Sequence, residues 1–128
     1  MISAVLRDYL ATQFGLVSGK DIFAETGQGE KYVLVKDSYP RPWTGMPSEF
    51  RTSHIQITVK GYDVEEGYLL SQRIVNALKP LHGTFTLGNE TFIVRSVKSV
   101  GLPLLATYKT FRAYSTNFSV SYIYDLTE

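Results

Sequence analysis

The sequence predicts an α+β fold: a single domain with one mainly antiparallel sheet and two helices packed on one face of it. One observation is a stretch, His54–Lys60, in which apolar and polar residues alternate strictly, as in a half-buried strand. It leads directly into apolar residues at helical spacing that continue to Leu81. A further alternating stretch, Arg112–Tyr124, lies near the end of the chain. The length of 128 residues is that of one ordinary domain, and we assign residues 1–128 to it.

The composition excludes several classes of protein. A net charge of +1 argues against a protein that holds nucleic acid mainly through its phosphates, because such proteins carry a basic surplus. The absence of cysteine excludes disulfides and thiolate zinc sites. The chain has no long apolar run and does not begin like a signal peptide, so we expect no membrane span.

The first part of the chain predicts one helix and two strands. Apolar residues recur at intervals of three and four from Ser3 to Gln13, which predicts an amphipathic helix that ends near Gly15. Two short strands follow, Asp21–Glu25 and Tyr32–Asp37. The segment between them contains two glycines, and we interpret the pair as a hairpin.

The segment Ser38–Arg51 is predicted to be a long loop. It contains three of the five prolines and the only tryptophan, and proline excludes both helix and interior strand. Its large side chains suit a partner interface, and the candidate residues are Tyr39, Arg41, Trp43, Met46 and Phe50. Two interpretations stay open: Trp43 packs on its own domain, or these side chains wait for a neighbouring molecule.

The central and last parts of the chain predict the second helix and three strands. Asp63 stands at the N-cap position and Glu66 three residues later, which predicts a capping box with Asp in the Ser/Thr position. The Gly88-Asn89-Glu90 segment predicts a hairpin between Thr84–Leu87 and Thr91–Val97. We interpret Val100–Leu105 as an apolar connection, because Gly101 and Pro103 interrupt it.

No group of residues predicts an enzyme. The carboxylates Asp63, Glu65 and Glu66 are spaced as metal ligands can be, but the first turn of a helix favours carboxylates for structural reasons. His54 and His82 have no cysteine nucleophile and no second histidine at ligand spacing. The Gly27-Gln28-Gly29 segment precedes a strand, whereas a phosphate loop precedes a helix, so we interpret it as a turn.

The last alternating stretch has one aromatic face and one small polar face. Tyr114, Phe118, Tyr122 and Tyr124 share one face, where they either form part of the core or stack nucleic-acid bases. The core is the better interpretation, because no basic residues are interleaved with the rings. The opposite face carries Ser115, Asn117, Ser119 and Ser121.

Three stretches together carry a resemblance to a known family: Phe50–Leu78, Val97–Pro103 and Phe111–Tyr122. They combine an extended strand with a Gln that leads into a helix, a Gly-Pro linker, and a closing Tyr-Ser-Thr-Asn-Phe-Ser-Val-Ser-Tyr pattern. In their order and spacing the chain resembles the minor capsid and tail terminator (head-tail joining) proteins of long-tailed bacteriophages.

The resemblance implies a structural protein of the virion, made in the host cytoplasm, that forms a ring of six copies at the end of the tail tube. Its implied partners are other copies of itself, the tail tube protein and the head connector or completion protein. DNA passes through the ring without specific binding, and neither a cofactor nor a reaction is involved. In such a ring Ser115, Asn117, Ser119 and Ser121 are candidates for the channel lining. We also expect the Ser38–Arg51 loop to be mobile in the free subunit and ordered in the ring.

A function of another class stays open beside this one. The aromatic face of the last strand would then bind single-stranded nucleic acid or a peptide.

Overall fold

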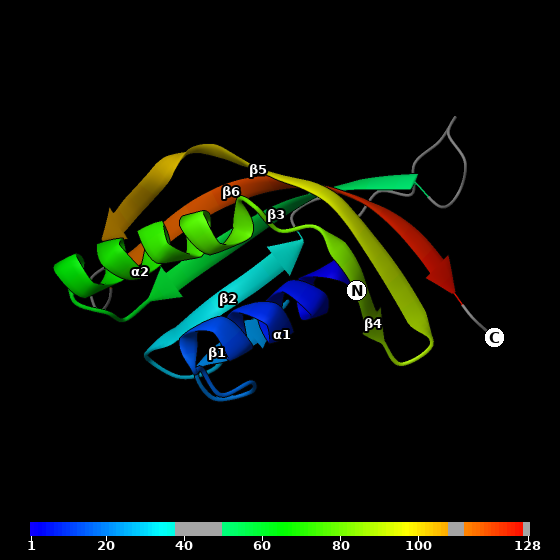
Figure 1. Ribbon diagram of the computed structural model, residues 1–128. Coiled ribbons are helices and arrows are strands. Elements are labelled where there is room, and N and C mark those ends of the chain that lie inside the picture. The colour runs from blue at the N-terminus through cyan, green and yellow to red at the C-terminus, as the bar shows by residue number, and fades with distance from the viewer. Residues whose placement is uncertain (38–49, 108–111, 127–128) are drawn as a thin grey trace.

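The computed structural model describes residues 1–37, 50–107 and 112–126, and these form one six-stranded sheet with two helices on the same face (Figure 1). The strand order is β1-β2-β3-β6-β5-β4, and every neighbouring pair except β1 and β2 is antiparallel. The elements are α1 (Ile2–Phe14), β1 (Ile22–Ala24), β2 (Tyr32–Asp37), β3 (Phe50–Lys60), α2 (Val64–Leu78), β4 (Gly83–Leu87), β5 (Glu90–Thr107) and β6 (Arg112–Leu126). The α+β fold predicted from the sequence is confirmed.

Helix α1 ends where the sequence predicts. Gly15 adopts a left-handed conformation with φ 64° and ψ 30°, which glycine reaches without a steric penalty. The buried side of α1 packs against β1 and β2, and it consists of Ile2, Ser3, Ala4, Val5, Leu6 and Leu10.

The pairing predicted for the first two strands is wrong. β1 and β2 run parallel, with Ile22 opposite Val33 and Ala24 opposite Val35, so they do not form a hairpin. The segment Glu25–Lys31 carries the chain back along the short β1 before β2 begins. Seven residues reach roughly 23 Å when extended, which is ample for a three-residue strand. The two glycines in this segment therefore serve a return connection.

The centre of the sheet is formed by β3 and β6. They pair over eleven positions, from Phe50 opposite Ile123 to Lys60 opposite Ala113. β3 therefore begins four residues before His54, the first residue of the predicted strand. Phe50, which was predicted to belong to the loop, is the first residue of β3.

Helix α2 lies across β6, β5 and β3 (Figure 1). Its first turn carries Glu65 and Glu66, and Asp63 occupies the N-cap position as predicted. The predicted capping box is absent, because the Asp63 side chain makes no capping hydrogen bond and only its carbonyl oxygen accepts from the Gly67 amide, at 2.7 Å. Gly67 lets the helix approach the sheet, since a Cβ at this position would meet the Tyr114 ring at 3.0 Å.

The hairpin between β4 and β5 is confirmed. Leu87 pairs with Glu90, so Gly88 and Asn89 form a two-residue loop, and Gly88 has a φ of 63°. The interpretation of Val100–Leu105 as a connection is wrong, because this segment belongs to β5 and pairs with β6. Register shifts at Val94/Ser96 and at Val100/Leu104 absorb the extra residues, so Gly101 and Pro103 bend the strand and do not end it.

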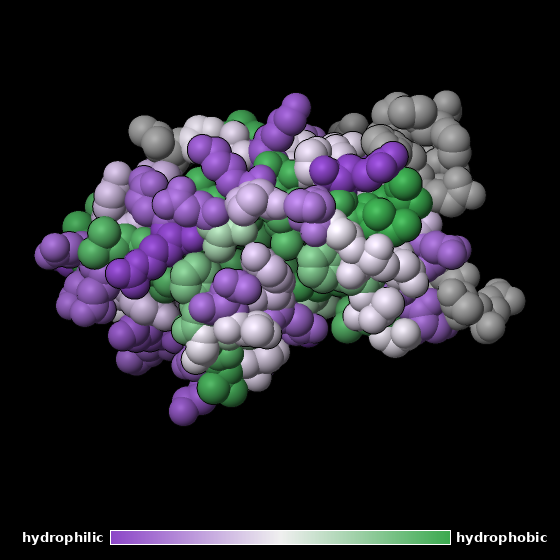
Figure 2. All heavy atoms as spheres, viewed as in Figure 1, coloured by the Kyte–Doolittle hydropathy of each residue, from purple (hydrophilic) through white to green (hydrophobic). Residues whose placement is uncertain are grey.

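The core lies between the sheet and the two helices. Its largest fully buried side chains include Phe92 and Phe118 from β5 and β6, Leu6 and Leu10 from α1, and Ile74 and Leu78 from α2. Figure 2 views the helix side and shows mainly hydrophilic residues over the end of the molecule where α2 begins, with apolar residues visible between them. In the described residues, neither helix combines the length and the hydropathy needed to cross a bilayer.

Candidate functional site

The two faces of the sheet differ in what covers them. Tyr114, Phe118 and Tyr122 of β6 point to the side of α1 and α2, and each is more than nine-tenths buried. The interpretation of these rings as core is therefore confirmed, and they are unavailable for stacking against bases. Tyr124, which follows them on the same face near the end of β6, is only half-buried.

The opposite face, which we call the helix-free face, carries the predicted polar residues. Ser115, Ser119 and Ser121 are half-buried and Asn117 is exposed. Their cross-strand partners on β3 are Thr58, Gln56, His54 and Thr52. The Thr58 and Ser115 hydroxyls lie 3.5 Å apart, and the middle of this face consists of polar side chains along the two central strands.

A second feature is the outer edge of β5. β4 pairs with β5 only from Glu90 to Val94, and among the described residues no strand pairs with the same edge from Arg95 to Thr107. An unpaired edge presents backbone N–H and C=O groups to any chain that can add a strand.

Apolar side chains flank this edge on both faces of the sheet. Val100 and Leu104 lie on the helix-free face, opposite Asn117 and Ser115, and are 58% and 68% exposed. Leu105 lies on the helix side and is 46% exposed. We call the edge Arg95–Thr107 with these three side chains the β5 edge surface.

The first turns of α2 continue this surface on the helix side. Leu105 pairs with Tyr114, whose ring centroid lies 6.1 Å from that of the exposed Tyr68. The Tyr114 hydroxyl donates to the carbonyl oxygen of Val64 at 2.9 Å, which fixes the start of α2 on the sheet.

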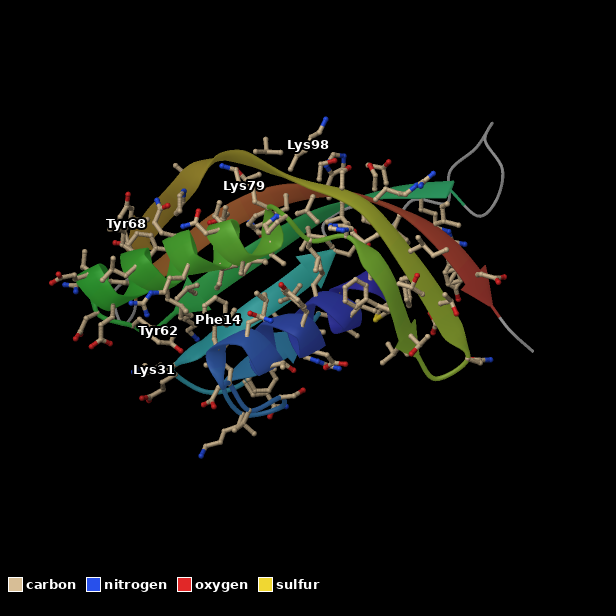
Figure 3. All side chains as sticks on the ribbon, in the orientation of Figure 1. Phe14, Lys31, Tyr62, Tyr68, Lys79 and Lys98 are labelled. Carbon is tan, nitrogen blue, oxygen red and sulfur yellow. The ribbon has the colours of Figure 1, made fainter. Side chains whose placement is uncertain are left out.

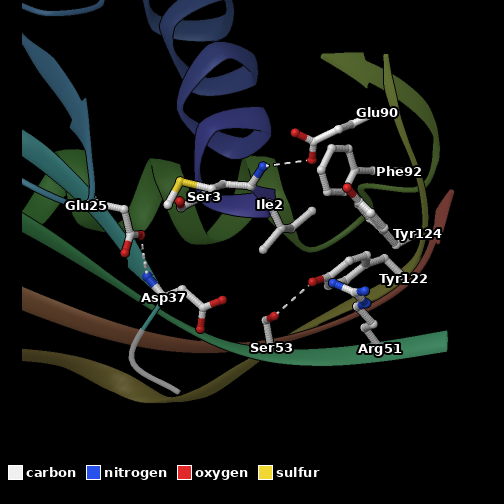
Figure 4. A pocket seen from close by; sticks show the side chains of 11 residues that line it. Ile2, Ser3, Glu25, Asp37, Arg51, Ser53, Glu90, Phe92, Tyr122 and Tyr124 are labelled. Atoms are coloured by element: carbon white, nitrogen blue, oxygen red, sulfur yellow. Dashed lines mark hydrogen bonds and ion pairs between the residues drawn. The ribbon is translucent and has the colours of Figure 1, made fainter. Parts of the chain in front are cut away.

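A cavity of about 470 Å³ lies at the start of α1, between this helix and the ends of β2, β3, β5 and β6 (Figure 4). The N-terminal amine lies 3.3 Å from Glu90 Oε2, and the Arg51 guanidinium lies 4.3 Å from the centre of the Tyr124 ring. The Ser53 and Tyr122 hydroxyls lie 3.2 Å apart.

The remaining polar groups of the cavity carry mixed charge. The backbone amide of Asp37 donates to Glu25 Oε2 at 2.9 Å. Burial raises the pKa of the Tyr124 phenol above its ordinary value, and its hydrogen bond with Glu90 raises it further. The cavity is lined by two cationic groups, the N-terminal amine and Arg51, and by the carboxylates of Glu25, Asp37 and Glu90, so its walls carry both signs of charge.

The other residues singled out in the sequence lie apart from one another. Asp63, Glu65 and Glu66 are exposed around the start of α2, and within the described residues no three His, Asp or Glu side chains gather as a metal site requires. His54 lies on the helix-free face, whereas the His82 ring lies 2.9 Å from the carbonyl oxygen of Pro80. Gly27 and Gly29 lie between β1 and β2.

The predicted partner loop is outside the described residues, apart from its end. Tyr39, Arg41, Trp43 and Met46 lie in the segment 38–49, which the structure does not describe. Phe50 and Arg51 open β3, and Arg51 contacts the Tyr124 ring.

The sequence-based interpretation missed the β5 edge surface. The available signal was the length of the extended run from Thr91 to Leu105, which exceeds that of its hairpin partner Thr84–Leu87. A strand longer than its partner leaves an unpaired edge. Gly101 and Pro103 are typical of the end of a strand, so this run was interpreted as a strand followed by a connection.

Comparison with known proteins informs the fold only. No protein-family model and no curated protein matches the chain. A solved structure whose name describes no function matches 99% of this chain and 92% of its own, with a TM-score of 0.56 and 11% sequence identity. At this identity the likeness concerns the fold alone.

Proposed function

We propose that this chain is a structural subunit of the head-tail junction of a long-tailed bacteriophage, where a ring of copies caps the tail tube and offers a surface to the head connector. The observation that carries the proposal is the β5 edge surface. Its unpaired backbone groups and its exposed apolar side chains on both faces suit a neighbour that adds a strand. The family resemblance of the sequence supplies the identity of the assembly.

A ring requires two different contact surfaces on each copy. A closed cycle uses heterologous contacts, so the β5 edge surface of one copy meets another part of the next copy. The two sides of the sheet differ as this requires: on one side β5 extends beyond the edge strand β4 and offers a long edge, whereas the edge strand β1 on the other side has only three residues. A contact between two β5 edges would instead give a two-fold dimer.

In the proposed ring, the helix-free face turns toward the channel. Short side chains such as Ser119 and Ser121 leave a wide passage, and the buried aromatic rings are kept away from the DNA. The two helices then lie on the outer side, where α2 is available to the tail tube or the head connector.

The experiment that tests the proposal is native mass spectrometry over a range of protein concentrations, with and without the tail tube protein, together with electron microscopy of the same samples. We expect closed rings when the tube end is present or the concentration is high. Stable two-fold dimers at every concentration would contradict the proposal. The neighbouring reading frames offer an independent check, since a tail tube gene is expected beside this one.

Ser119→Arg tests whether the helix-free face lines the channel. Ser119 lies between Lys98 and His54 in one cross-strand row, so an arginine here adds a long cation where DNA would pass. We expect a folded protein and slower DNA ejection from particles that carry the variant. Gln13→Arg, at an exposed position on α1, is the matched control. Ejection at the rate of the control would mean that this face lies elsewhere in the assembly.

A further inference from the structure

The charged residues are unevenly distributed over the two faces of the sheet. Among the described strand residues whose face is fixed by the register, the cationic side chains of the helix-free face are Lys36 of β2, Lys60 of β3 and Lys98 of β5; Arg95 lies in the first bulge of β5. Among the described strand residues of this face, Asp125 is the only carboxylate, and it lies near the end of β6. This face is therefore basic although the whole chain has a net charge of only +1.

The strand register fixes where these cations lie. Lys36 is opposite Gln56, which is opposite Asn117, and Lys98 is opposite Ser119 in the neighbouring row. Three strand spacings separate β2 from β5, about 14 Å across the sheet. Gln56 and Asn117 in the first row, and Ser119 and His54 in the second, are the polar residues of β3 and β6 in these rows.

The lysines differ in their local partners. Lys60 Nζ lies 3.4 Å from the carbonyl oxygen of Gly29 and 5.0 Å from the centre of the Tyr32 ring. Lys36 and Lys98 are exposed, and Figure 3 shows Lys98 projecting from β5 away from α1 and α2. The two exposed lysines on either side of the polar rows are the positions that a large anion would reach.

From this arrangement we infer that the helix-free face holds duplex DNA by its phosphates, with Lys36 and Lys98 as the contacting residues. The inference rests on the proposed function in one respect: the proposed ring turns the helix-free face toward the channel, where DNA is the available partner. A duplex carries one charge per 1.7 Å of its axis, so a length equal to the lysine separation presents roughly eight charges. No carboxylate lies between the two lysines in these rows to repel the phosphates, and no base edge has to be read.

The contact is weak in one copy and additive in a ring. Two phosphate contacts per copy give a slope of roughly −2 in a plot of log affinity against log salt concentration. Copies joined in a ring present their lysines together, which raises the affinity without any new contact. DNA is then retained loosely and remains able to slide, because the phosphate contact does not depend on sequence.

The test is fluorescence anisotropy with a short duplex of random sequence at about 50 and 200 mM salt. The variant is K36E/K98E, and the control is K20E/R73E, which makes the same change in net charge at exposed positions outside this face. We expect salt-sensitive binding by the unmodified protein, at least about tenfold weaker binding by K36E/K98E, and a change within about twofold for the control. If K36E/K98E does not fold, K36Q/K98Q replaces it.

Two results would overturn the inference: no binding by the unmodified protein at the lower salt concentration, or equal losses in the variant and the control. Native mass spectrometry of the same samples keeps the ring separate from the DNA contact. If the protein forms a ring that does not bind DNA, the inferred DNA contact is contradicted and the proposed function stands. If the protein never forms a ring, but DNA binding is lost in K36E/K98E and retained in the control, the inferred DNA contact is supported and the proposed function is contradicted.

Discussion

Replacing Val100 and Leu104 together with glutamate is expected to abolish the ring without unfolding the subunit. Both side chains are largely exposed on the β5 edge surface, so the isolated domain loses little packing. Burying the exposed part of these two side chains at each contact contributes about 2 to 4 kcal/mol, and a buried unpaired carboxylate adds a further cost. Association of each pair of copies should weaken by at least about a hundredfold, measured by native mass spectrometry or analytical ultracentrifugation.

The matched control carries the same two added charges at exposed helix positions. Gln13→Glu on α1 combined with Asn76→Glu on α2 should leave the ring intact and the melting temperature nearly unchanged. Rings formed by the V100E/L104E protein would show that the subunits meet elsewhere. A melting temperature well below that of the control would show that these side chains stabilise the monomer itself.

Phe118→Ala should cause a large loss of stability. Phe118 is 1% exposed and lies at the centre of the sheet, opposite Ile55 of β3 and Ser99 of β5. Truncating a buried phenylalanine costs about 3 to 5 kcal/mol, since apolar contacts are lost and a cavity remains. For a domain of this size we expect the melting temperature to fall by at least about 10 °C in calorimetry.

Ser119→Ala is the control for Phe118→Ala. It changes the adjacent residue on the opposite face, where removal of a hydroxyl should alter the free energy of unfolding by less than about 0.5 kcal/mol. Similar shifts for the two variants would mean that the two faces of β6 are equally important for packing, contrary to the burial of their side chains.

Local patterns in the sequence predicted the elements whose structure is determined locally. The alternation in Arg112–Tyr124 identified β6 and its buried parity, and Gly88-Asn89 identified the hairpin. The parallel pairing of β1 and β2 was missed, because a segment with two glycines permits a return connection as readily as a hairpin. Both bulges of β5 depend on β6, a long partner that continues to pair with β5 beyond Gly101 and Pro103.

The candidate site was predictable in composition but not in position. Alternation placed Ser115 and Ser119 on one face of β6, yet only the packing of both helices on the other face leaves that side of the sheet without a helix. The β5 edge surface depends on β4 ending its pairing at Val94, which is a property of two strands and not of either alone. The basic character of the helix-free face likewise requires the register that brings β2, β3 and β5 into common rows.

The position of β6 in the sheet has a consequence for synthesis on the ribosome. β6 follows all other strands in the sequence, but it lies in the middle of the sheet between β3 and β5. Until Arg112–Leu126 leaves the exit tunnel, β3 and β5 lack their common partner and their apolar faces stay open to solvent. Such non-local pairing is slow, and exposed strands favour aggregation. The nascent chain therefore completes its core only after translation of its last strand, and chaperones that shield apolar strands have their opportunity before that moment.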